Sequence, residues 1–158
     1  MKKYLILVFT LLSTPAFATD TFPMSPDPTI TPGSLCDKPA SKRYPEGVPY
    51  CERDVRGELK REIMITYDSR LGYRVVAMER SAFKIDHYIP LCAGGSNKPD
   101  NLWPQHKSVY VVTDLLEQVA CEKMALGKLR QADAVAYIKR AKANLTEAPA
   151  ITRQIQNL

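Results

Sequence analysis

Four cysteines behind an N-terminal export-signal pattern constrain the fold of this chain most. Lys2 and Lys3 precede an apolar run over residues 4–12, Pro15 interrupts it, and residues 16–18 have the small-x-small pattern of a signal peptidase site. An exported protein with an even number of cysteines usually forms disulfides, because it folds under oxidising conditions. We therefore expect residues 1–18 to be a signal peptide cleaved after Ala18, and the cysteines that remain to pair.

The four cysteines allow three pairings, and proximity along the chain favours Cys36–Cys51 with Cys92–Cys121. A zinc site built from all four is the alternative. It is disfavoured because no two of them have the C-x2-C spacing that structural zinc sites use. We expect a periplasmic or extracellular protein, without a membrane anchor once the signal peptide is removed.

The composition is that of a soluble globular domain. Of 158 residues, 45% are hydrophobic and 25% are charged, which excludes a wholly disordered, a collagen-like and a multi-span membrane protein. The net charge is +5, and the excess of positive charge lies in residues 122–158. Such a bias suggests an anionic partner, although a solvated helix face is its commoner cause.

Residue patterns divide the expected mature chain into an arm, a central domain and a tail. Residues 19–53 are rich in proline and cysteine and predict an extended, poorly ordered arm. Residues 54–145 predict the domain, and residues 146–158 show little periodicity and predict a tail. Within the domain the expected helices are 54–67, with Asp54 as the N-cap, 107–127 and 131–144; the expected extended segments are 73–78, 83–91 and 101–104.

Both histidines of the chain flank a glycine loop at residues 93–97. Asp86 and His87 are neighbours, so their side chains serve one site only if the strand ends or bends beside them. The loop can then return Asn101 to the same place. Carboxylate and amide oxygens suit a hard divalent cation, and a neutral imidazole suits a general base near neutral pH. These residues predict a metal and a base acting on an anionic substrate.

The central segment resembles the HNH nucleases of the His-Me finger (ββα-metal) superfamily, and within them a branch of small exported bacterial proteins. The resemblance lies in Asp86-His87-Tyr88-Ile89-Pro90-Leu91, then Gly94-Gly95-Ser96, then Asn101-Leu102-Trp103-Pro104-Gln105. The resemblance implies an α+β fold: a ββα-metal finger, flanked by an N-terminal helix and C-terminal helices and stabilised by disulfides. It also implies an endonuclease. His87 matches the general base, Asp86 a metal ligand, and Asn101 the residue that orients the histidine or binds the metal. The implied cofactor is a single divalent cation, Mg²⁺ first, with Mn²⁺ or Zn²⁺ as alternatives.

One position departs from the family. Its third histidine usually lies about two turns into the helix after the asparagine, where this chain has Val109, Tyr110, Val111 and Val112. His106 is the candidate replacement ligand, and Asp86 with Asn101 alone is the alternative. Glu117 lies on the same expected helix, and we expect it to form a structural ion pair rather than to bind the metal.

The expected partner is nucleic acid, with DNA favoured over RNA and little sequence specificity, bound by a monomer. The candidate phosphate contacts are basic residues on the expected outer surface: Lys107, Lys128, Arg130, Lys139, Arg140 and Lys142. Two other functions remain open. One is an HNH-fold module that binds nucleic acid without cleaving it, and the other is an envelope interaction protein that uses the cysteine-rich arm.

Overall fold

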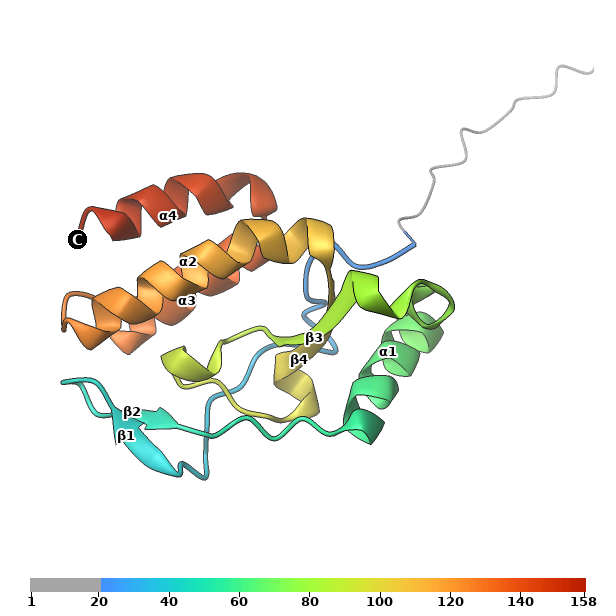
Figure 1. Cartoon of the computed structure of the whole chain (residues 1–158), viewed down its shortest axis with the longest axis horizontal. Coiled ribbons are helices and arrows are strands. Elements are labelled where there is room, and N and C mark those ends of the chain that lie inside the picture. The colour runs from blue at the N-terminus through green and yellow to red at the C-terminus, as the bar shows by residue number, and fades with distance from the viewer. Residues whose placement is uncertain (1–20) are drawn as a thin grey trace, which may run out of the picture.

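The computed structural model describes residues 21–158, so the expected signal peptide lies outside the described residues. Within the described part the fold is α+β (Figure 1). Its four helices are α1 (Gly57–Leu71), α2 (Lys107–Ala125), α3 (Gln131–Ala143) and α4 (Ala148–Gln156). Its strands form two antiparallel pairs, β1 (Ser41–Arg43) with β2 (Val48–Tyr50), and β3 (Phe83–His87) with β4 (Leu102–His106).

The β3–β4 hairpin is the centre of the fold, because it separates two hydrophobic cores. Helices α2, α3 and α4 pack together on one side, and α1 packs against β4 on the other (Figure 1). His87 pairs with Leu102 at one end of the hairpin, and Phe83 pairs with His106 at the other end. β4 continues into α2 without an intervening loop. β3 is shorter than the expected strand over 83–91, since the chain turns after His87 toward Pro90 and a 3-10 turn at Leu91–Ala93.

Residues 146–158, expected to form a tail, instead include helix α4. Pro149 lies in its first turn, where a missing backbone N–H costs nothing. Ala148, Ile151, Thr152 and Ile155 are buried and fall on one face, and the three apolar ones belong to the core that α2 and α3 complete. The apolar residues of this segment repeat over only about two helical turns. Such a short pattern does not identify a helix unless the helices that it packs against are known.

Two details of the α1 region differ from expectation. Helix α1 begins at Gly57 after Arg56, so Asp54 is not its N-cap. The expected strand at 73–78 contains a 3-10 turn, Val75–Ala77. The reason is Asp68, at the end of α1, whose carboxylate accepts hydrogen bonds from the backbone N–H groups of Val75 (2.7 Å) and Val76 (2.9 Å). A side chain that captures these donors replaces a strand partner.

Both expected disulfides are confirmed, Cys36–Cys51 and Cys92–Cys121, with Cα atoms 5.8 and 5.9 Å apart. They rule out the four-cysteine zinc site and indicate an oxidising compartment. In residues 21–158 no helix combines the length and apolar character needed to cross a bilayer. The arm also packs on the domain: Thr31 is buried, and its hydroxyl bonds the Tyr67 hydroxyl (2.7 Å) and the Leu102 carbonyl (3.1 Å).

Candidate functional site

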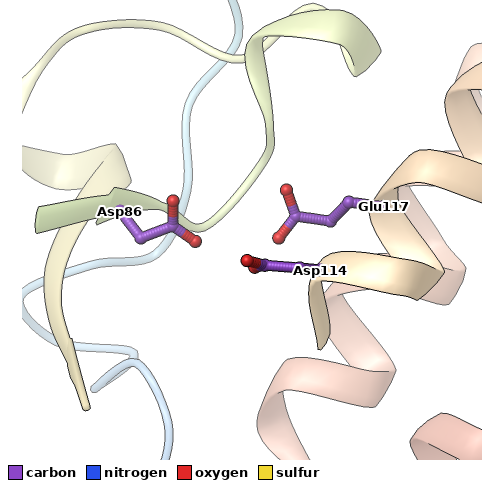
Figure 2. Close-up of side chains that lie close together, drawn as sticks. All are labelled: Asp86, Asp114 and Glu117. Atoms are coloured by element: carbon purple, nitrogen blue, oxygen red, sulfur yellow. The ribbon is translucent and has the colours of Figure 1, made fainter. Parts of the chain in front are cut away.

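Three carboxylates converge between β3 and α2 (Figure 2). Asp86 projects from β3, and Asp114 and Glu117 project from α2. One oxygen from each lies within 4.8 Å of the others. We call Asp86, Asp114 and Glu117 the acidic triad. The hairpin and the helix that continues from it are what bring these three side chains together.

Sequence reasoning identified only Asp86 as a member of the triad. It missed Asp114, and it assigned Glu117 to a structural ion pair. Asp114 and Glu117 are three residues apart on α2, so they lie on one helix face, and this spacing was the available signal. Their approach to Asp86 depends on the angle between α2 and the hairpin, which residue spacing does not give.

Lys142 on α3 lies against the triad, although it was expected on the surface. Its side chain is wholly buried. The ammonium nitrogen is 3.0 Å from Asp86 Oδ2 and 2.6 Å from Glu117 Oε1, and it donates to the His87 carbonyl at 2.5 Å. The ion pair expected for Glu117 is therefore present. A buried lysine requires such partners, because an unpaired charge in the interior costs several kcal/mol, on the order of the stability of a domain.

Burial and charge set the pKa values of the triad. Burial raises the pKa of Glu117 to about 7, against the attraction of Lys142. Burial also acts to raise the pKa of Asp86, but Lys142 and Lys84 outweigh it and hold that pKa below its ordinary value. For Lys142, the two carboxylates outweigh burial and raise its pKa. Two carboxylates thus share the ammonium of Lys142, and Asp86 is the more firmly ionised of the two.

The donor set of the triad fits a hard divalent cation. All three members offer carboxylate oxygen, the ligand that Mg²⁺ and Mn²⁺ prefer. Lys142 contacts Asp86 Oδ2 and Glu117 Oε1. The second oxygen of Asp86, Oδ1, is 3.8 Å from Lys84 Nζ. Lys84 Nζ contacts Asp114 Oδ1 at 2.6 Å. When Glu117 is ionised, three carboxylates against two lysines leave one negative charge, which favours a cation over an anion.

Any cation binding at the triad is expected to depend on pH through Glu117. Glu117 is protonated below about pH 7 in the folded protein and must lose that proton to act as a ligand. We expect Mn²⁺ affinity to rise about tenfold per pH unit between pH 5 and 7 and to level off above pH 7. Titration calorimetry at four pH values measures this slope. Glu117→Gln should bind more weakly and show no slope in this range, and a slope unchanged in that variant would contradict the assignment.

His87, the last residue of β3, points into a hydrogen-bond network of neutral groups and one arginine. Its side chain is 3% exposed. Nε2 lies 3.0 Å from Asn97 Oδ1, and Nδ1 lies 3.2 Å from Arg53 Nη1. Burial lowers the pKa of His87 to about 4, and the charge of Arg53 adds to this effect. The imidazole is therefore neutral across the physiological range, as a general base requires.

Asn101 supports the loop between the two strands. Its side-chain oxygen accepts from the Ile89 N–H (2.9 Å), and its Nδ2 donates to the carbonyls of Ile89 (2.9 Å) and Ser96 (2.8 Å). Gly95 lies against this clamp, where a Cβ would come within 1.8 Å of the Ile89 carbonyl oxygen. The amide of Asn101 thus fixes the backbone behind His87, and the structure does not bring it into the acidic triad.

His106 lies at the end of the hairpin away from His87, since it pairs with Phe83. Its ring stacks on Phe22 with centroids 4.0 Å apart, and its Nδ1 accepts from the Ser108 N–H as the N-cap of α2. About 10 Å of strand separates Phe83 from Asp86 along β3. His106 is therefore not among the residues that face Asp86.

The expected phosphate contacts do not form one patch. Lys107 begins α2, whereas Lys128 and Arg130 follow its end, and 19 helical residues span about 28 Å. Lys139 donates to the Pro32 carbonyl (2.8 Å), and Arg140 pairs with Glu147. The cation that contacts the ring of His87 is Arg53, which sequence reasoning did not identify. It lies two residues after Cys51, in a segment with no recognisable period.

The last two residues of β3 thus carry one carboxylate of the triad and a neutral imidazole, and Arg53 contacts the imidazole. These are the parts needed to bind an anionic ester and to deprotonate a water molecule. No protein-family model, no curated protein and no solved structure matches this chain, so its function is inferred from these residues alone.

Proposed function

We propose that this protein is an exported, metal-dependent endonuclease of the HNH type, which hydrolyses phosphodiester bonds with little sequence specificity. One observation carries the proposal: one oxygen from each of Asp86, Asp114 and Glu117 lies within 4.8 Å of the others, and a neutral histidine follows Asp86 in β3. The order of β3, glycine loop, β4 and α2 agrees with a ββα-metal finger. In this proposal Asp114 and Glu117 supply the ligands that the family takes from its third histidine.

The residues of the chain divide the reaction between them. A divalent cation bound at the triad supplies Lewis-acid stabilisation of the scissile phosphate and of the leaving oxygen. His87 takes a proton from a water molecule, whose oxygen forms a bond to phosphorus while the bond from phosphorus to the leaving oxygen breaks. The leaving oxygen takes a proton from solvent. Asn101 holds the loop backbone that orients His87, and Lys142 holds Asp86 ionised.

The substrate in this proposal is nucleic acid, DNA before RNA. Arg53 is exposed and contacts His87, and a guanidinium there favours contacts to phosphate over contacts to bases. Binding should therefore weaken steeply with salt and vary little with sequence.

The two histidines give a matched test. We expect His87→Asn to lower metal-dependent nicking of supercoiled plasmid by about 100-fold to 10,000-fold, because asparagine cannot act as a general base near pH 7. The same substitution at His106 should stay within about threefold of wild type, since asparagine also caps a helix. Circular dichroism melting checks that both variants fold. Equal activity in the two variants would remove His87 from the reaction.

A further inference from the structure

Arg53 is held at His87 by contacts from three parts of the chain. Its Nη1 lies 3.2 Å from His87 Nδ1, and its Nη2 donates to the Ile85 carbonyl at 2.9 Å. The segment is fixed on one side by the Cys36–Cys51 disulfide. The next residue is fixed as well, because Asn97 Nδ2 donates to the Glu52 carbonyl at 2.6 Å. The cysteine-rich arm thus delivers an arginine to the hairpin.

The network assigns the proton of the imidazole. Arginine has only donors and keeps its charge, so His87 Nδ1 must accept from it. The neutral ring therefore carries its hydrogen on Nε2, which donates to Asn97 Oδ1. The amide of Asn97 is oriented by its own donation to Glu52. The lone pair that a general base would use is on Nδ1, and the guanidinium of Arg53 covers it.

Arg53 is also an exposed cation whose two contacts are neutral groups, an imidazole and a carbonyl. Its charge keeps its attraction for an anion. A guanidinium binds phosphate through paired, charge-assisted hydrogen bonds, which are roughly twice as strong as those to neutral acceptors. A phosphodiester at the edge of the site would compete successfully with His87 for Arg53.

We propose that Arg53 binds the phosphate of the scissile bond, and that its transfer from His87 to this phosphate uncovers Nδ1 for the attacking water. The proposal rests on the proposed nuclease function. It makes the base accessible only when substrate is bound. It also gives the Cys36–Cys51 disulfide a role in the site, that of holding Arg53 in reach.

Kinetics of plasmid nicking test the role of Arg53 in catalysis. We expect Arg53→Gln to lower kcat/KM by about 100-fold, and Arg53→Lys to recover only part of this loss, because lysine lacks the planar fork. Arg56→Gln is the matched control, since Arg56 is three residues away and its only ion pair in the described chain is with Asp54; it should stay within about twofold. Wild-type kcat/KM in Arg53→Gln would overturn the proposal.

A binding measurement separates this proposal from the nuclease function. A 12-base-pair DNA duplex is added to the protein in EDTA, and the ring nitrogen resonances of His87 are followed by NMR. We expect the Nδ1 resonance to shift in wild type and in Arg56→Gln, and not in Arg53→Gln. A shift in wild type without cleavage in any metal would support Arg53 and refute the nuclease. No shift in wild type, or an equal shift in Arg53→Gln, would overturn the role of Arg53.

Discussion

Asp114→Asn is expected to lower metal-dependent nicking by at least about 100-fold while leaving the fold intact. The activity should fall because the variant removes one of the three carboxylates that the proposed mechanism assigns to the cation. The fold should survive because Asp114 is half exposed, and its ion pair with Lys84 lies at the surface. Exposed pairs of this kind contribute about 0–1 kcal/mol to the free energy of unfolding. Plasmid nicking and urea unfolding measure the two quantities.

Asp133→Asn is the control for this variant. Asp133 is an exposed aspartate in the first turn of α3 and is not a member of the triad, so the substitution changes the net charge equally and leaves the triad complete. Nicking should stay within about twofold of wild type. If Asp114→Asn cleaves as well as Asp133→Asn, Asp114 does not hold the cation.

Lys142→Met is expected to lower the free energy of unfolding by about 3–5 kcal/mol. The substitution keeps an apolar side chain of similar length but leaves Asp86 and Glu117 buried without their shared cation. If the triad binds divalent cations, Mn²⁺ should restore part of this loss, since it supplies the missing positive charge and binds the folded state alone. Mn²⁺ should therefore raise the melting temperature of Lys142→Met more than that of wild type.

Lys128→Met provides the comparison. Lys128 is exposed in the turn between α2 and α3, so its replacement should change the free energy of unfolding by no more than about 0.5 kcal/mol. Urea unfolding of wild type and of both variants, with and without Mn²⁺, gives the six values needed. A loss in Lys142→Met no larger than in Lys128→Met would contradict the buried ionic contacts. An equal Mn²⁺ effect in Lys142→Met and wild type would contradict a cation site at the triad.

The features predicted correctly are those encoded locally. Helices α2 and α3 follow apolar periods of several turns, which are strong signals because they are long. The disulfides follow from an even cysteine number and short separations. Strand β4, which comes after the glycine loop, was predicted from the residues around Asn101. The side chain of Asn101 closes that loop.

The features missed are those that depend on contacts between distant segments. Lys142 has the spacing of a surface lysine, yet 56 residues separate it from the Asp86 carboxylate that it contacts. Arg53 is 34 residues from His87 and lies in a segment without a period. Asp114 becomes a candidate ligand only through the crossing of α2 and β3. Each depends on the relative placement of elements, which a pattern within one element does not encode.

The most direct test of the nuclease proposal is the cleavage of supercoiled plasmid by the oxidised wild-type protein, in Mg²⁺, in Mn²⁺ and in EDTA. The account predicts nicked and then linear plasmid in at least one of the two metals and intact plasmid in EDTA. Intact plasmid in every condition, from a folded protein that still retards DNA in a gel, would contradict it and leave an HNH-fold module that binds nucleic acid without cleaving it.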